Sequence, residues 1–157
     1  MLMAKRSRGM VSKKVLLDAE SETWKLTEHL TRFANAAFGR RLRASRALHE
    51  AVVSAIESGY THDELRLAFW VARCISGETW LKSALMRDLS PDIVLRHKGH
   101  TNPKTGQPAK RWLDELTSRA NETNPILVGA VLQKLPAEMI DDERELLKRM
   151  EVAFEER

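Results

Sequence analysis

The sequence has little of the residue types that support disulfide-bonded, β-rich or membrane-spanning proteins. One cysteine among 157 residues excludes an intrachain disulfide framework and a zinc site built from several cysteines. Seven glycines and five prolines are too few for a turn-rich β-sandwich or barrel. The longest apolar runs span only a few residues, and the basic N-terminus lacks the apolar stretch of a signal peptide. We therefore predict no membrane segment and expect a reducing, cytoplasmic location.

The common motifs of catalysis and cofactor binding are also missing. The sequence contains no Gly-rich phosphate-binding loop, no His-Glu-x-x-His motif and no Cys-x-x-Cys pair. Cys74 stands in an apolar helical context, which favours a buried structural thiol over a nucleophile. His97 and His100 form a close pair without neighbouring acids, so they do not indicate a metal site. We expect a protein without catalytic residues, cofactor or metal.

What the sequence does contain indicates a folded helical protein with an uneven charge distribution. Hydrophobic residues make up 43% and charged residues 31% of the chain, which is enough for one buried core. Residues 1–111 hold 20 basic and 11 acidic residues, whereas residues 112–157 hold 6 basic and 11 acidic residues. The net charge of +4 therefore combines a basic body with an acidic C-terminal part. Such asymmetry is typical of a polyanion-binding surface, although an unevenly charged solvated surface also explains it.

Apolar residues recur at three- and four-residue steps along most of the chain, and this spacing predicts an all-α fold. Helices are predicted over residues 22–38, 46–58, 62–75, 78–90, 112–120, 126–135 and 137–155. Gly39 and Gly59 fit helix ends, and Thr61 with Glu64 forms a capping box. We predict three segments: a flexible basic arm (1–20), a compact multi-helix domain (21–122) and a C-terminal helical extension (123–157).

Basic residues form three clusters in the sequence. Together they favour nucleic-acid binding more strongly than any one cluster would alone. One is the N-terminal arm. The second is a helix junction, and the third is a loop over residues 96–110 that is rich in glycine, proline and hydrogen-bonding side chains but has no carboxylate. The alternative is a solvated lysine-rich loop. The predicted phosphate-binding residues are Arg40, Arg41, Arg43 and Arg46 at the junction, and Arg96, Lys98, His100, Lys104, Lys110 and Arg111 at the loop.

Tryptophans near these basic segments have two interpretations. Trp70, Trp80 and Trp112 have the amphipathic rings that stack on unpaired bases. They also open or join apolar helical patterns, which favours core packing. Trp24 precedes the first apolar stripe, and its role is less clearly indicated.

The last predicted helix carries an apolar stripe on an acidic background. Ile140, Leu147, Met150 and Phe154 are spaced seven, three and four residues apart, as in a short coiled-coil seam. We predict that this stripe binds a partner or a second copy of the chain, while docking on the protein's own body is the alternative. The run Asp141–Glu143 is interpreted as first-turn acids that complement the helix dipole.

Several short motifs occur in a recognisable order between Thr27 and about Leu116. They are Leu30-Thr31-Arg32-Phe33-Ala34-Asn35, then Ile56-Glu57-Ser58-Gly59-Tyr60-Thr61-His62-Asp63-Glu64-Leu65, then Trp80, then Leu89-Ser90-Pro91 with Ile93-Val94-Leu95, and finally Lys110-Arg111-Trp112-Leu113-Asp114-Glu115-Leu116. In order and spacing this stretch resembles the DnaD-like domain of phage replication proteins and bacterial replication initiators.

The resemblance implies a small helical module that binds DNA, often single-stranded, and helps to load or organise a replicative helicase without catalysis. We therefore expect a phage-type DNA replication accessory protein, located in the cytoplasm of the bacterial host if a phage encodes it. Its expected partners are DNA, a replicative helicase or other replisome protein, and a second copy of itself. The alternative is a non-enzymatic protein–protein adaptor or inhibitor that acts through the acidic C-terminal helix.

Overall fold

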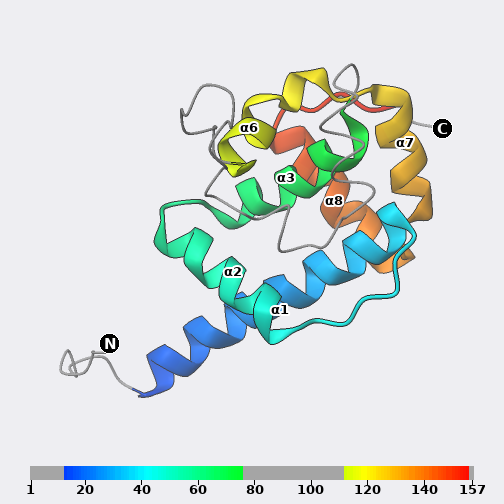
Figure 1. The fold of residues 1–157 in the computed structure, drawn as a ribbon. Helices are drawn as coiled ribbons and strands as arrows, with labels where there is room; N and C mark the ends of the chain where they lie inside the picture. Colours follow the sequence, from blue (N-terminus) through cyan, green and yellow to red (C-terminus); the bar gives the residue numbers. More distant parts are fainter. Residues whose placement is uncertain (1–12, 76–111, 156–157) are drawn as a thin grey trace, which may run out of the picture.

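The computed structural model describes residues 13–75 and 112–155, and side chains within 21–75 and 113–155. Its elements are α1 (Lys13–Phe38), α2 (Arg46–Glu57), α3 (His62–Cys74), α6 (Trp112–Ser118), the short 3₁₀ helix η2 (Ala120–Glu122), α7 (Pro125–Lys134) and α8 (Ala137–Arg149). Over these residues the structure has six α-helices, no β-strand and one isolated bridge between Ile75 and Thr123. The predicted all-α fold class is confirmed (Figure 1).

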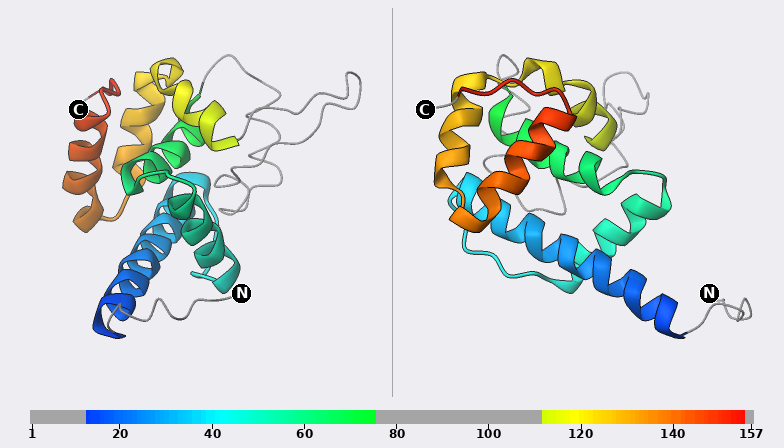
Figure 2. Two further views of the ribbon diagram at one scale, coloured as in Figure 1. Left: turned by 90° about the vertical axis from the view of Figure 1, so that its left-hand side faces the viewer. Right: turned by 180° about the vertical axis from the view of Figure 1, so that it is seen from behind.

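Helix α3 lies at the centre of the fold. Its start is fixed by the predicted capping box, in which the Thr61 hydroxyl accepts from the Glu64 N–H and the Glu64 carboxylate accepts from the Thr61 N–H. It packs against α1, α6, α7 and α8, which surround it in Figures 1 and 2. Eight of its thirteen residues are buried, including Trp70 and Cys74. The sequence predicted one apolar face, but a helix with neighbours on several sides buries side chains all around it.

Helix α1 carries the predicted stripe but is longer than predicted. Leu26, Leu30, Phe33 and Ala37 are buried, as the spacing required. The helix begins at Lys13 rather than at residue 22, so residues 13–20, predicted as part of the arm, are helical. Its first turns project away from the other helices (Figure 2). Residues 13–20 carry one apolar run, Val15-Leu16-Leu17, without recurrence at three- and four-residue steps, so hydrophobic periodicity did not predict a helix there.

One core joins the two predicted segments 21–122 and 123–157. Leu113 of α6, Val128 of α7 and Leu147 of α8 are buried in the same cluster as the α1 and α3 side chains. At residues 122–123 the chain stays attached to the end of α3, because the Asn124 N–H donates to the Cys74 carbonyl at 3.0 Å. The C-terminal helices are therefore integral to the fold.

Part of the predicted organisation lies outside the described residues, namely the arm over residues 1–12, the helix over 78–90 and the loop over 96–110. Within the described part, α2, α3, α6 and α7 occupy the predicted positions to within a few residues. None of the described helices has the length and apolar character needed to cross a bilayer.

Helix α8 stops at Arg149, six residues before the predicted end, through a Schellman turn. The Val152 N–H donates to the Leu147 carbonyl at 2.9 Å, and the Glu151 N–H donates to the Lys148 carbonyl at 3.1 Å. Glu151 has a φ of 57°, the left-handed conformation that normally favours glycine. Val152 is buried beside the helix end, so the apolar contact that accompanies this turn is made by a residue outside the helix.

Replacing Glu151 with glycine removes the cost of a side chain in the left-handed region and should stabilise the protein by about 1 kcal/mol. The matched control is Glu145→Gly, also exposed but inside α8, which should destabilise by about 1 kcal/mol. Urea unfolding of the two variants checks both signs. A loss of stability in Glu151→Gly would contradict the turn geometry.

Candidate nucleic-acid interface

The predicted basic junction is an ordered connection between α1 and α2. Gly39 follows the last residue of α1 with a φ of +68°, which turns the chain out of the helix. Asn35 then fixes the connection through two hydrogen bonds: its amide donates to the Leu42 carbonyl at 2.9 Å, and the Leu42 N–H donates to the Asn35 side-chain oxygen at 2.7 Å. Leu42 packs against the core, and Ser45 caps α2 by accepting from the Leu48 N–H.

This anchoring leaves arginines on the outer side of the connection. Arg41 and Arg43 flank the inward-packed Leu42, and both are exposed. Within the described part of the chain neither forms an ion pair. The side chain of Arg46 is 92% exposed and lies 3.3 Å from the Glu50 carboxylate, a surface pair of little strength. We call residues 40–46 the arginine stretch; Arg40 within it is half-buried.

Asn35 was not among the residues singled out for binding, although it belongs to the motif at the end of the first helix. An asparagine in an apolar helical stripe, four residues before a glycine, is the sequence signal that was available. The other predicted phosphate-binding residues lie outside the described residues; they are Arg96, Lys98, His100, Lys104, Lys110 and Arg111. Trp80 and the side chain of Trp112 lie outside them too.

The stripe predicted to bind a partner is covered by the protein's own body. Leu147 is completely buried, and Ile140, Met150 and Phe154 are partly buried against the core. Helix α8 packs on α3 and α7, as Figure 2 shows from behind. This is the docking alternative that the sequence left open, and it leaves the polar side of α8 facing outward.

A buried carboxylate holds α8 in place. Glu143 is 1% exposed, and its Oε1 accepts from the Trp70 indole N–H at 3.0 Å. Its Oε2 accepts from the Arg66 guanidinium and from His29 Nε2, the latter at 3.0 Å. The prediction that Asp141–Glu143 are first-turn acids serving the helix dipole is wrong. They lie beyond the first turn, and Glu143 faces the core because α3 supplies partners for it.

Further ion pairs run along both sides of this carboxylate. Arg66 also contacts the exposed Asp142 at 3.2 Å, while Arg32 of α1 contacts Glu138 of α8. At the C-terminal end of α8 the helix supplies the cation instead of the anion, because Arg149 lies 3.2 Å from Asp63, the residue that follows the first residue of α3. Three carboxylates of α8, those of Glu138, Asp142 and Glu143, are thus paired with arginines of α1 and α3. These arginines are different from those of the arginine stretch.

Burial by itself would raise the pKa of Glu143. The hydrogen bond from His29 and the charge of Arg66 outweigh that effect and hold the pKa below its ordinary value of 4.5. His29, Asp142 and Glu143 also place potential metal-ligand atoms within 4.8 Å of one another. Because Arg66 already supplies a positive charge to both carboxylates, a metal ion would have to displace it. We interpret the cluster as structural.

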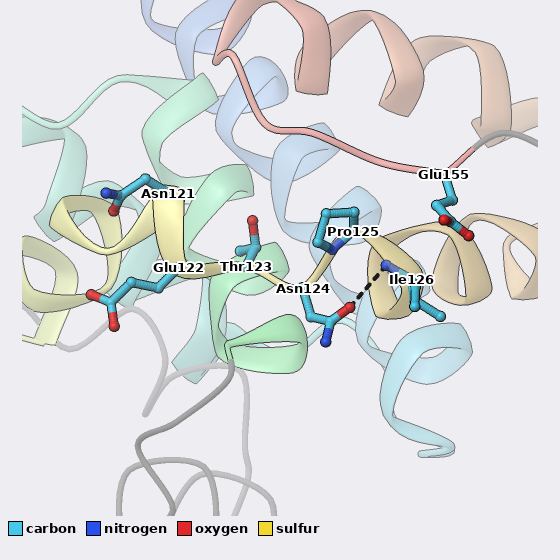
Figure 3. Close-up of a pocket in the computed structure, with 7 residues that line it drawn as sticks. All are labelled: Asn121, Glu122, Thr123, Asn124, Pro125, Ile126 and Glu155. Atoms are coloured by element: carbon cyan, nitrogen blue, oxygen red, sulfur yellow. Dashed lines mark hydrogen bonds between the residues drawn. The ribbon is translucent and has the colours of Figure 1, made fainter.

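An open hollow of about 550 Å³ lies where η2 meets α7 and the C-terminal segment (Figure 3). Five of its seven lining residues are polar; the lining consists of Asn121, Glu122, Thr123, Asn124, Pro125, Ile126 and Glu155. Asn124 is engaged in capping α7, because its side-chain oxygen accepts from the Ile126 N–H at 2.9 Å. The charged groups of this lining are carboxylates, so it does not suit a phosphate. The arginine stretch is therefore the better candidate for a nucleic-acid contact.

Comparisons of the chain with protein-family models, with curated proteins and with solved structures find no match.

Removing the charge of Glu143 should destabilise the fold strongly. Glu143→Gln takes the one buried carboxylate away from Arg66, whose side chain is 11% exposed, and leaves it only the more exposed Asp63 and Asp142 as partners; breaking such a pair costs up to about 3–5 kcal/mol. The matched control is Asp142→Asn, which removes a 62% exposed carboxylate from the same arginine and should cost under about 1 kcal/mol. Chemical denaturation measures both, and equal effects would show that burial does not matter here.

The same carboxylate should make the fold acid-sensitive. Its pKa is depressed in the folded state, so its contribution is full above 4.5 and declines as the pH falls through the lower folded value. The stability difference between the wild type and Glu143→Gln should therefore shrink on acidification below pH 4.5. Unfolding curves recorded from neutral to acidic pH test this, and a difference that stays constant would contradict it.

Proposed function

We propose that this chain is a non-enzymatic DNA-binding accessory protein of phage-type replication, with single strands favoured and a replisome protein such as a helicase as a further partner. The observation that carries DNA binding is the arginine stretch, an anchored segment with exposed guanidinium groups. The replication context rests on the resemblance of residues 27–116 to the DnaD-like domain. A cytoplasmic site of action follows from that context.

Anchoring matters because it lowers the cost of binding. Binding a phosphate orders both an arginine side chain and the backbone that carries it. The hydrogen bonds between Asn35 and Leu42 already order part of this backbone, so less conformational freedom is lost on binding. Arginine also suits this role, because its planar guanidinium donates two parallel hydrogen bonds to a phosphate. Contacts of this kind hold the protein on the nucleic acid without reading its sequence.

The charge distribution supports this surface over others. Arg32 and Arg66 are basic residues of the body, but carboxylates of α8 neutralise them. Arg41 and Arg43 have no such acidic cover among the described residues. The connection between α1 and α2 therefore carries exposed positive charge that the carboxylates of α8 do not pair with. The predicted loop over residues 96–111 would extend the same kind of surface.

The adaptor or inhibitor alternative acts through the acidic C-terminal helix, whose apolar stripe was the predicted contact with a partner. With Leu147 buried and its neighbours packed on the body, such a partner would have to contact the outer polar side of the helix. Exposed acids, Asp141 and Glu145 among them, are what that side offers. DNA binding remains the function that the described surface favours.

The double variant Arg41→Ala/Arg43→Ala should weaken DNA binding. If each arginine neutralises one phosphate, the slope of log K against log salt concentration on a single strand should fall by roughly 0.7 for each contact removed. Fluorescence anisotropy with a labelled oligonucleotide over a salt series measures affinity and slope together. The loss should be similar for strands of different sequence, because phosphate contacts carry no sequence information.

Lys134→Ala/Lys148→Ala is the matched control, since it removes the same charge from exposed positions on α7 and α8. It should leave the slope unchanged. Equal effects of the two double variants would show that net charge, and not the arginine stretch, is responsible. A wild-type protein that binds no DNA at about 50 mM salt would refute the proposed function.

A further inference from the structure

Trp24 is a partly exposed tryptophan held at the place where α1 meets α2. The residue is 37% exposed, whereas Trp70 is fully buried in the core. The Trp24 ring lies edge-to-face with the imidazole of His49, with 5.3 Å between ring centroids and 80° between ring planes. Thr23 Oγ1 lies 2.8 Å from His49 Nε2. Two consecutive residues of α1 therefore hold the imidazole, which in turn supports the indole.

A single exposed aromatic ring is common on protein surfaces, so exposure alone indicates nothing. The neighbourhood of Trp24 is what distinguishes it. His49 lies one turn after Arg46 on α2, and residues three apart share a helix face. The last residue of the arginine stretch therefore lies one helical turn from the imidazole that contacts the indole. Figure 1 shows the start of α2 beside the middle of α1, with the connection of residues 39–45 running along α1 to reach it.

Local charge favours an anionic ligand at this place. The carboxylates nearest to Trp24 in sequence are those of Asp18, Glu20, Glu22 and Glu28, and Glu50 directly follows His49. Glu22 and Glu50 form ion pairs with Lys25 at 3.6 Å and Arg46 at 3.3 Å. These surface pairs are weak and exchange readily with solvent or phosphate. Over residues 13–50 as a whole, eight basic residues stand against these five acids.

We infer that Trp24, supported by His49, is a stacking platform for an unpaired base of single-stranded DNA, whose phosphates are bound by Arg43 and Arg46. The inference rests on the proposed function and adds to it the group that contacts the base. Stacking on an aromatic side chain requires a free base face, which a duplex does not offer along its length. The platform would thus give this surface its preference for single strands.

The test compares two strands of equal length that differ only in their bases. One is oligo(dT), and the other is an abasic strand with the same phosphates. Stacking contributes about 1–3 kcal/mol per base, so Trp24→Ala should weaken oligo(dT) binding about 5- to 150-fold. Binding of the abasic strand and the salt slope on oligo(dT) should stay unchanged, because no phosphate contact is lost. Ile126→Ala is the matched control: another exposed apolar residue, at 55%, on a different helix.

Two further variants guard against loss of folding as an explanation. Trp24→Phe keeps an aromatic face and should retain most of the affinity, whereas Trp24→Leu keeps apolar volume without that face and should behave like alanine. Circular dichroism measures whether each variant is folded. If Trp24→Ala is unfolded, the affinity of Trp24→Leu for oligo(dT) tests the platform in its place. Equal losses on oligo(dT) and the abasic strand, or full affinity of Trp24→Leu, would overturn the platform.

Failure of this inference is distinguishable from failure of the proposed function. Wild-type DNA binding that is sensitive to Arg41→Ala/Arg43→Ala but not to Trp24→Ala or Trp24→Leu overturns the platform alone. A wild-type protein that binds neither strand overturns both.

Discussion

The buried carboxylate of Glu143 is the interaction on which the arrangement of the helices depends. Placing a charged group in a core is costly unless hydrogen bonds and an opposite charge compensate it. Trp70 and Arg66 of α3 and His29 of α1 provide that compensation. Because these partners come from two helices, α8 can satisfy its carboxylate in only one register and orientation. Leu146 and Leu147 on the same helix are then directed into the core.

This register also decides which basic residues stay available for a ligand. Carboxylates of α8 meet Arg32 and Arg66, so the positive charge on that side is used within the fold. The arginine stretch lies on the connection between α1 and α2 and takes no part in these pairs. Stability and the candidate interface therefore draw on different arginines. Arginines of the candidate interface can therefore be replaced without removing the ion pairs that stabilise the fold.

Much of the fold could be predicted from the sequence because it depends on local rules. The apolar spacing in α1, the capping box of Thr61 and the glycine after Phe38 each specify a helix or its end without reference to the rest of the chain. The burial of Glu143 could not be predicted in this way. An acidic residue in an acidic helix is expected at the surface, and only the three-dimensional position of Arg66 and Trp70 reverses that expectation.

The candidate site divides along the same line. The prediction of a basic surface at residues 40–46 followed from the number of arginines there and from the helix ends on either side. That the segment is anchored did not, because the bonds between Asn35 and Leu42 depend on the chain folding back along α1. The pairing of Trp24 with His49, residues 25 positions apart, depends on the crossing of α1 and α2. The replication role stays a proposal, because the resemblance that suggested it has no support from the comparisons.

The acidic character of α8 would oppose the proposed DNA binding less strongly than its composition indicates. Several of its carboxylates are paired with cations of the body, which cancels their charge at a distance. The remaining exposed acids act through solvent, where physiological salt reduces their influence beyond about 8 Å. Phosphates bound at the connection between α1 and α2 would respond mainly to the exposed arginines beside them. A chain with nearly balanced charge can thus have a locally positive surface, provided that many of its carboxylates form ion pairs within the fold.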